Sequence, residues 1–340
     1  MKKVFKMIWM TLGGLLLLIA IAATLFVNFS PQFGQAPSKA RTESFEQLPN
    51  YQQGKFQNLS PSPMDIDYWK TTKEWLKEAP GRSPDQNIAV EKVNPASINN
   101  PGQDTTRLIW FGHSAFLLQI DGKHILLDPM FGNTPAPHPL LGPGRYSSEL
   151  PLQIEQLPAI DAVMLSHDHY DHLDYGSIAR LKDRVAHFYT PLGLGSHLRA
   201  WGVADAKITE LNWWESTELD GLRLVCTPAR HFSGRGLFDR AATLWGSWVI
   251  TGKRENIFFS GDSGYDTHFA TIGERYGPFD LALIECGQYN EEWKLLHMMP
   301  EETVQAAVDV RSKLLMPIHW GAFTLALHDW TEPAERAPEK

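Results

Sequence analysis

The chain begins with an uninterrupted apolar run at residues 7–27, which follows Lys2, Lys3 and Lys6. At about 1.5 Å per residue, a helix of this length can cross a hydrocarbon core of about 30 Å. A cleaved signal peptide usually has a shorter apolar run that ends in small residues, whereas residues 25–29 are mostly bulky. We therefore expect residues 1–27 to form an uncleaved transmembrane anchor.

The three lysines indicate how this anchor is oriented. Basic residues beside an anchor stay on the cytoplasmic side, so the rest of the chain is expected on the other side of the membrane. In a Gram-negative bacterium this would be a single-pass protein of the inner (cytoplasmic) membrane, with its folded part in the periplasm.

The next segment, residues 28–63, is polar and rich in Pro, Gln and Ser. This composition predicts a tether that lifts the folded part off the bilayer. Residues 64–340 are then expected to form one domain, which opens with a short amphipathic helix within 64–80. We expect Trp69 and Trp75 of this helix to pack on the domain, with insertion into the membrane interface as the alternative.

From residue 107 onward, short apolar runs typical of strands alternate with runs typical of helices. Helices are expected near 177–182 and over 300–311, where Pro300 takes the first position and two glutamates follow. The order of the runs indicates two mixed sheets with helices outside them, an α/β sandwich rather than a doubly wound sheet. Strands are predicted at 108–111, 116–120, 124–127, 161–166, 222–226, 244–250, 257–260, 281–285 and 313–318.

The composition, 43% hydrophobic and 21% charged, is that of a folded protein with a sizeable core. Outside the anchor the chain has 28 basic and 39 acidic residues, a net charge of −11, which argues against nucleic acid as a partner. Cys226 and Cys286 both lie in apolar runs. We therefore expect buried thiols rather than a disulfide or a cysteine-rich zinc site.

The strongest chemical signal follows an apolar strand-like run and reads Ser166-His167-Asp168-His169-Tyr170-Asp171-His172. A loop that leaves the end of a strand can direct His167 and His169 toward one point. Asp171 and His172 can then be directed toward a second point nearby. Because neutral imidazole and carboxylate groups are good ligands for Zn²⁺, the loop predicts a site for two metal ions.

Two metal ions need further ligands, and three candidates lie elsewhere in the chain. Each of His231, Asp262 and His319 comes just after an apolar strand-like run. Gly261 and Gly264 allow the backbone to turn tightly beside Asp262. Three strands that each end in a ligand-type residue strengthen the prediction of a metal site at one edge of the sheets.

These residues together resemble the metallo-β-lactamase superfamily. The spacing His167-x-His169-x-Asp171-His172, with the later three residues, is similar to the ligand pattern of that superfamily and implies an αββα sandwich. Further stretches resemble the N-acylphosphatidylethanolamine-hydrolysing phospholipase D group, over about residues 107–335. They include Leu126-Leu127-Asp128-Pro129, Gly142-Pro143-Gly144-Arg145-Tyr146, Leu244-Trp245-Gly246-Ser247-Trp248 and Gly277-Pro278-Phe279-Asp280-Leu281.

The resemblance implies a di-zinc centre in which Asp262 bridges the two ions. It assigns His167, His169 and His231 to one zinc. The other zinc would be held by Asp171, His172 and His319. Di-iron relatives of this fold typically have Glu at the position of His169, so zinc is favoured, with iron or manganese as alternatives.

A two-zinc centre predicts hydrolysis by a water molecule that the ions activate, while the ions neutralise charge on a phosphodiester. Asp171, as a ligand, and His297 are the predicted catalytic residues. His297 occupies the position of an active-site histidine in the resembled group and would protonate the leaving alkoxide. The alternative for His297 is a solvent-exposed residue beside a helix.

Four other residues receive less specific predictions. Asp128 either accepts a hydrogen bond from a ligand imidazole or belongs to a simple turn. His113 is expected to be a core histidine rather than a neighbour of the metals. Tyr289 and Trp293 are expected to pack as ordinary aromatic residues rather than to line a pocket.

The resembled enzymes hydrolyse N-acylated phosphatidylethanolamine to phosphatidic acid and an N-acylethanolamine. The expected substrate is therefore a phospholipid or another phosphodiester, and the membrane is the expected partner. A hydrolase of the same fold that acts on a lactone, a β-lactam or another small ester is the alternative. A membrane-tethered binding protein with a vestigial site is a third interpretation, against which the presence of all the predicted ligands argues. The oligomeric state is left open.

Overall fold

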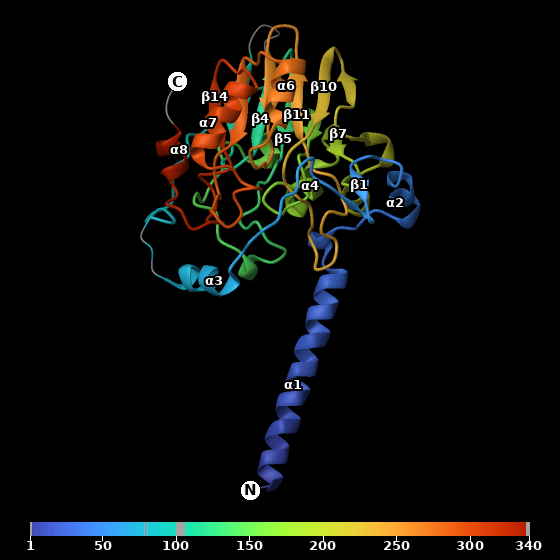
Figure 1. Cartoon of the computed structure of the whole chain (residues 1–340), viewed down its shortest axis with the longest axis vertical. Helices are drawn as coiled ribbons and strands as arrows, with labels where there is room; N and C mark the ends of the chain where they lie inside the picture. Colours follow the sequence, from blue (N-terminus) through green and yellow to red (C-terminus); the bar gives the residue numbers. More distant parts are fainter. Residues whose placement is uncertain (1, 78, 80, 100–105, 338–340) are drawn as a thin grey trace.

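The computed structural model describes residues 2–77, 79, 81–99 and 106–337 of the chain. A long helix, α1 (Lys2–Phe29), projects from a folded domain (Figure 1). None of its residues is buried, and its mean hydropathy of 2.4 and length of 28 residues fit a membrane span. The apolar run predicted at 7–27 lies inside this helix, which makes α1 a candidate transmembrane segment.

The domain contains two six-stranded sheets. The strands of the first sheet are β3 (Arg107–Trp110), β4 (Phe116–Ile120), β5 (Lys123–Leu127), β6 (Ile160–Met164), β7 (Val185–Pro191) and β8 (Ile208–Leu211), in that order. The second sheet has β9 (Ser216–Leu219), β10 (Leu222–Thr227), β11 (Ser247–Thr251), β12 (Asn256–Phe259), β13 (Leu281–Glu285) and β14 (Leu315–Ile318), also in sequence order. Both sheets are mixed, as predicted. In the first sheet the strands from β3 to β5 pair antiparallel and those from β5 to β8 pair parallel. In the second sheet the strands from β9 to β12 pair antiparallel and those from β12 to β14 pair parallel.

The buried side chains of the strands form three apolar layers, one between the two sheets and one on the outer face of each sheet. The main core lies between the sheets, where Phe116 of β4 and Trp248 of β11 belong to one cluster of buried side chains. The outer face of the first sheet is covered by α4 (Tyr175–Leu181) and α5 (Gly195–Ala200). The outer face of the second sheet is covered by α6 (His268–Tyr276) and α7 (Pro300–Asp309). The fold is therefore an αββα sandwich, which confirms the predicted fold class.

Two local predictions are confirmed as well. The helix α7 begins at Pro300, with two glutamates in its first turn, where the sequence placed it. Cys226 and Cys286 are buried free thiols. Among the described residues, short 3-10 helices lie at η1 (Pro31–Phe33), η2 (Pro95–Ser97), η3 (Pro139–Leu141), η4 (Ile154–Gln156) and η5 (Asp205–Lys207), and a short helix, α8 (Glu332–Arg336), follows β14.

The segment predicted as a tether is different in the structure. Residues 38–56 contain α2 (Lys39–Phe45) and a hairpin of β1 (Tyr51–Gln52) and β2 (Lys55–Phe56). The side chains of Phe45, Tyr51 and Phe56 are buried and join the core cluster between the sheets. Three aromatic side chains bury enough apolar area to order a segment whose other residues are mostly polar. The prediction of a free spacer over 28–63 is wrong for this part.

The residues directly after α1 are also held against the domain. Gly34 has a φ of 64°, and a Cβ at this position would lie 2.2 Å from His197 Nδ1, so that only glycine fits. The N–H of Gln35 donates to His197 Nδ1 over 3.0 Å, and Arg235 Nε donates to the carbonyl of Gln32 over 2.9 Å. The chain therefore passes from α1 directly onto the domain surface.

The helix expected within 64–80 is α3 (Tyr68–Leu76). Its N-terminus is capped by Asp67, whose carboxylate accepts hydrogen bonds from the N–H groups of Trp69 and Lys70. The side chains of Trp69 and Trp75 are 71% and 40% exposed. Our expectation that both tryptophans pack on the domain is therefore wrong, because neither side chain is buried.

Candidate metal centre

The histidine-rich loop leaves the carboxyl end of β6 and runs to the start of α4. At its beginning, Asp128 accepts hydrogen bonds from the backbone N–H of Ser166 (2.7 Å) and from the Ser166 hydroxyl (2.5 Å). At its end, the carboxylate of Asp174 caps α4 by accepting from the N–H groups of Gly176 and Ser177. Because both ends are fixed, the side chains of residues 167–172 have defined directions.

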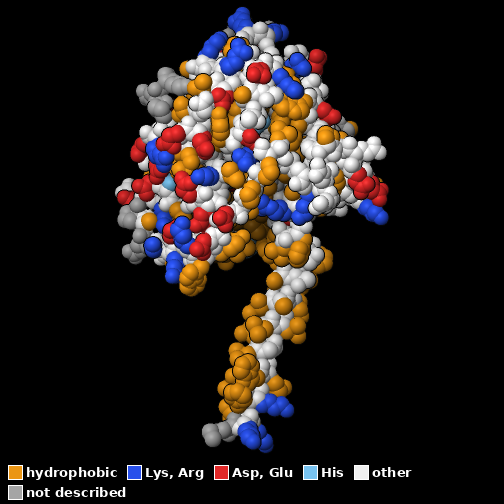
Figure 2. Space-filling view, in the orientation of Figure 1, with side chains coloured by type: hydrophobic (Ala, Val, Ile, Leu, Met, Phe, Trp, Pro, Cys, Tyr) orange, Lys and Arg blue, Asp and Glu red, His pale blue; other side chains and the backbone are white. Residues whose placement is uncertain are grey.

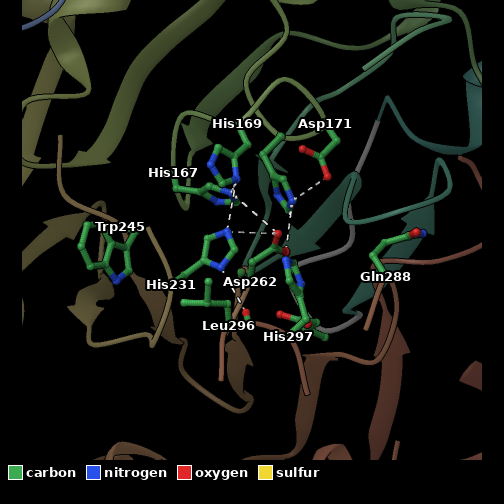
Figure 3. Close-up of polar contacts among 12 residues, drawn as sticks. His167, His169, Asp171, His231, Trp245, Asp262, Gln288, Leu296 and His297 are labelled. Atoms are coloured by element: carbon green, nitrogen blue, oxygen red, sulfur yellow. Dashed lines mark hydrogen bonds and ion pairs between the residues drawn. The ribbon is translucent and has the colours of Figure 1, made fainter. Parts of the chain in front are cut away.

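The other predicted ligands follow strands of the second sheet. His231 comes after β10, Asp262 after β12 and His319 after β14. Gly261 has a φ of 56°, and a Cβ there would lie 2.5 Å from the Cβ of Ser166. This close approach of the two loops brings Asp262 next to the histidine-rich loop. Figure 3 shows His167, His169 and His231 gathered around Asp262.

One group of four possible ligands is formed by His167, His169, His231 and Asp262, whose nearest donor atoms all lie within 4.8 Å of one another. His167 Nε2 and His231 Nε2 each lie 3.7 Å from Asp262 Oδ2. His169 Nδ1 is 2.9 Å from His167 Nε2 and 3.2 Å from His231 Nε2. Three imidazoles and one carboxylate that converge in this way fit a tetrahedral metal site.

A second group of four is formed by His113, Asp171, His172 and His319. His113 Nε2 lies 2.8 Å and His319 Nε2 lies 3.1 Å from Asp171 Oδ2. Asp262 connects the two groups, since its Oδ1 is 3.1 Å from His172 Nε2 and its Oδ2 is 3.1 Å from His319 Nε2. All seven ligands predicted from the sequence therefore lie together, with Asp262 between the two sets.

Several histidines of the candidate metal site are oriented by acceptors on the far side of the ring. His231 Nδ1 donates to the carbonyl of Leu296 (3.1 Å), and His319 Nδ1 donates to the carbonyl of Gly287 (3.2 Å). His172 Nδ1 donates to Asp128 Oδ2 over 2.7 Å. Each bond fixes the ring and leaves Nε2 facing the cluster, as in most protein metal sites. The role predicted for Asp128 as an acceptor for a ligand imidazole thus agrees with the geometry.

The electrostatics of the cluster favour a bound cation. Burial lowers the pKa of His167 and of His231 well below the usual value, so these imidazoles are neutral and can bind metal. Burial would also lower the pKa of His172, yet the carboxylates of Asp262, Asp171 and Asp128 raise it well above the usual value. The carboxylates thus stabilise positive charge at this point, which a metal ion would supply.

Two buried polar atoms support the same conclusion. Asp262 Oδ1 and His172 Nε2 lie 3.1 Å apart, yet within the part of the chain that the structure describes neither atom has a partner with hydrogen-bond geometry. Leaving such groups unsatisfied costs about 1–3 kcal/mol each, more when they are charged. A metal ion bound between the two groups of four ligands would satisfy both atoms, so the residues present fit a pair of metal ions.

Two members of the cluster were not predicted from the sequence. His113, expected to be a core histidine, lies in the second group of ligands, where burial and the nearby His319 lower its pKa to about 3. Glu285, the last residue of β13, is buried, and its Oε1 lies 2.8 Å from His297 Nδ1. The signal for Glu285 was present, since it is a carboxylate at the end of an apolar strand, like Asp262.

A cavity of about 280 Å³ opens beside the cluster, and its accessible wall is mostly apolar although half of its lining residues are polar. His297 lies on its wall, and its ring stacks on that of His319 at a centroid distance of 5.2 Å. Trp293 lines the cavity, contrary to our expectation, whereas Tyr289 packs elsewhere and hydrogen-bonds to Glu332, in agreement with it. The other lining residues include Met64, Ile66, His169, Asp171, Phe232, Asp262, Leu296, His319 and Leu325.

An αββα sandwich with two groups of histidine and carboxylate ligands at the ends of its strands is the arrangement of a metal-dependent hydrolase. A family model described as a beta-lactamase superfamily domain matches residues 123–320. The chain belongs to this superfamily, the metallo-β-lactamase superfamily.

Individual relatives agree with this assignment. An uncharacterised protein of Mycobacterium tuberculosis is 44% identical over 300 residues, which cover 86% of this chain and 79% of that protein. N-acyl-phosphatidylethanolamine-hydrolyzing phospholipase D 1 of Caenorhabditis elegans is 35% identical over 243 residues, 68% of each chain. Among solved structures, the metallo hydrolase Igni18 of Ignicoccus hospitalis is similar at a TM-score of 0.51, with 25% identity over 68% of this chain and 90% of that one.

Proposed function

We propose that this protein is a di-zinc phosphodiesterase that hydrolyses N-acylphosphatidylethanolamine-like phospholipids in the manner of a phospholipase D. The observation that carries the proposal is the pair of ligand groups joined by Asp262 at the wall of an apolar cavity. Two metal ions can act on a phosphodiester, and an apolar cavity can accept acyl chains. The 35% identity to a phospholipase of this kind supports the same choice of substrate.

In this proposal the ligands divide as the sequence suggested. His167, His169 and His231 hold one zinc ion. Asp171, His172 and His319 hold the other, and Asp262 lies between the two. His113 contacts Asp171 and keeps that carboxylate in place. When bound, the two ions would supply an activated water and neutralise negative charge on the phosphate group. Zinc is proposed over iron or manganese because the donor set is rich in neutral imidazole.

The chain's own residues handle the leaving group. His297 lines the cavity, and its Nδ1 contacts the buried carboxyl group of Glu285. This contact orients the ring so that Nε2 is available to the substrate. Burial lowers the pKa of His297 and raises that of Glu285, so a neutral ring accepts from the Glu285 carboxyl group at Nδ1 and carries its proton on Nε2. His297 then donates the Nε2 proton to the leaving alkoxide while Glu285 passes its proton to Nδ1. Phe232, Leu296 and Leu325 exclude water from the apolar side of the cavity and contact the acyl chains.

The same proposal includes the location of the protein. We infer that α1 remains uncleaved and spans the inner membrane, with Lys2, Lys3 and Lys6 on the cytoplasmic side. The folded domain, which begins at about residue 30 because the residues after α1 already contact it, would lie on the periplasmic side. Protease treatment of intact spheroplasts tests this orientation, since the domain should be digested without lysis of the cells.

Lipid mass spectrometry tests the catalytic proposal. Full-length, zinc-loaded protein is reconstituted into vesicles of mixed phospholipids that contain N-acylphosphatidylethanolamine. We expect loss of this lipid with formation of an equal amount of phosphatidic acid, and inhibition by a chelator. The variant His187→Ala, which changes a half-buried histidine on β7 away from the cluster, should retain activity. Ring opening of lactones or β-lactams without any phospholipid turnover would contradict the proposal.

A further inference from the structure

Three elements on one side of the domain expose large apolar side chains to solvent. In the loop at 233–241, Phe238 is 95% exposed, and it is preceded by the exposed Leu237. Exposed leucines also lie in η3, and exposed aromatic and aliphatic residues lie in α3. Single exposed apolar residues are common, but a cluster of them on one side marks an interaction surface. The set comprises Tyr68, Trp69, Trp75, Leu76, Leu140, Leu141, Leu237 and Phe238, which we call the apolar underside.

Contacts connect each of these elements to the end of α1 or to one another. The ring of Phe26 in α1 packs edge-on against His138, the residue before η3, at 6.1 Å between centroids. Arg235 in the loop at 233–241 binds the carbonyl of Gln32, just after α1. Arg240 of the same loop lies 4.0 Å from the sulfur of Met64, shortly before α3. In Figure 1, α3 lies on the side of the sheets from which α1 leaves.

The position of α1 fixes the height of the domain above a membrane. The apolar run of α1 ends at residue 27, and contacts with the domain already begin at Phe26. If residues 7–27 fill the hydrocarbon core, Phe26 lies at its outer boundary. The elements next to Phe26 must then lie at the membrane interface, because no spacer lifts the domain away from it. Figure 2 shows apolar side chains where α1 meets the domain.

We propose that the apolar underside docks the domain on the lipid bilayer, with Trp69, Tyr68 and Phe238 inserted among the headgroups. Aromatic side chains of this kind favour the membrane interface. Basic side chains accompany them and would contact anionic headgroups: the ammonium group of Lys73 lies 4.8 Å from the Trp69 ring, and the guanidinium of Arg240 lies 3.8 Å from the Phe232 ring.

Docking in this orientation has a consequence for the cavity. Met64 and Ile66, just before α3, and Phe232, just before the loop at 233–241, are among its lining residues. Two elements of the apolar underside thus border the cavity, so that its entrance lies at the membrane surface and a substrate can enter from the lipid. The proposal rests on the anchored topology proposed above, but it does not depend on the identity of the substrate.

Fluorescence quenching on the full-length protein in vesicles tests the docking. The variant Phe238→Cys is labelled with an environment-sensitive fluorophore, since Cys226 and Cys286 are buried and do not compete for the label. The matched control is Leu314→Cys, which is 62% exposed and directly precedes β14, at the opposite end of that strand from His319. We expect lipid-attached nitroxide to quench the label at position 238 at least about twofold more than the label at 314, and aqueous iodide to show the reverse order.

Other outcomes would overturn the docking proposal. If iodide quenches both labels equally, the underside faces water. If neither quencher reaches position 238, the surface is covered by protein, as in a dimer. These results are independent of catalysis, so they stay informative even if phospholipid is not the substrate.

If the protein hydrolyses phospholipid in vesicles, an activity measurement provides a second test of docking. The double variant Leu237→Asp with Phe238→Asp should lower turnover of vesicle phospholipid about tenfold and leave turnover of a water-soluble phosphodiester unchanged. The variant Leu314→Asp should change neither rate. An unchanged rate of the double variant on vesicles, or an equal loss on both substrates, would count against docking through this surface.

Discussion

The end of the sheets that carries the predicted metal site and the segment that follows α1 differ in how clearly their local sequence indicates their structure. The predicted ligands lie in short motifs at the ends of apolar strands, and the structure brings all of them together. The segment at residues 30–66 has a polar composition, yet it packs on the domain through a few aromatic residues and backbone contacts. Local composition thus describes the first region well and the second one poorly.

The largest expected effect concerns the metal-binding end. Replacing His169 by Ala removes an imidazole that lies within 3.2 Å of both His167 and His231. We expect hydrolytic activity to fall at least about 10³-fold, because the metal ions supply several kcal/mol of transition-state stabilisation. Metal analysis should show fewer than two ions per chain, while circular dichroism stays unchanged. An unaltered rate would mean that the ligand assignment is wrong.

The second expected effect concerns the N-terminal segment. Phe45 is buried in the core cluster, so Phe45→Ala should lower the free energy of unfolding by about 3–5 kcal/mol. Leu59 lies in the same segment but is exposed, and Leu59→Ala should change this free energy by less than about 0.5 kcal/mol. Urea unfolding of the two variants in detergent measures the difference. Equal stabilities would show that the segment is a loose tether after all.

These two regions explain how far the sequence alone could go. Strand-end ligands are predictable because parallel strands bring their carboxyl ends to one edge, whatever the details of packing. His113 was assigned to the core because a lone histidine gives no local sign that it contacts Asp171, 58 positions away. Phe45 contacts Tyr51 and Phe56 of its own segment, but the core cluster that these rings join also contains residues of both sheets, such as Phe116, more than 70 positions away. Nonlocal packing of this kind leaves no periodic pattern in the segment itself.

A residue that joins the two regions allows a finer test. Asn58, in the N-terminal segment, accepts from the backbone N–H of His231 (3.1 Å) and donates to its carbonyl (2.8 Å). Its side chain also accepts from Trp245 Nε1 over 3.0 Å. Asn58→Ala should therefore loosen a ligand without removing it, and we expect about tenfold weaker metal binding, as for other residues that support metal ligands.

The matched control for this variant is Asn50→Ala. Asn50 is buried in the same segment and donates to Asn212 over 2.8 Å, away from the ligand loops. This variant should be less stable but should bind metal normally. Titration with zinc in the presence of a competing chelator measures both variants. If Asn50→Ala weakens metal binding as much as Asn58→Ala, the segment acts through general stability and not through His231.

The smallest expected effect is the loss of folding stability that histidine protonation causes in mild acid. It concerns the sheet region, because the first histidine of the chain is His113 and the N-terminal segment has none. His268, at the start of α6, is buried, and burial lowers its pKa to about 3. The unfolded chain has a histidine pKa of about 6.5, so below this pH the unfolded state binds a proton that the folded state does not. Stability contributed by neutral His268 is therefore complete above about pH 6.5 and is lost as the pH falls toward 3.

Between about pH 7.5 and 5.5 this loss amounts to about 1.4 kcal/mol for a single site. The variant His268→Gln keeps a polar group that can bond to Ser263, the present partner of the ring at 3.2 Å, but it does not titrate. Its free energy of unfolding should fall by about 1.4 kcal/mol less than that of the unaltered protein over this interval. Urea unfolding at the two pH values measures both slopes. If both proteins lose the same free energy of unfolding over this interval, His268 does not cause the loss. The buried histidines of the predicted metal site would then be the groups that take up protons on unfolding.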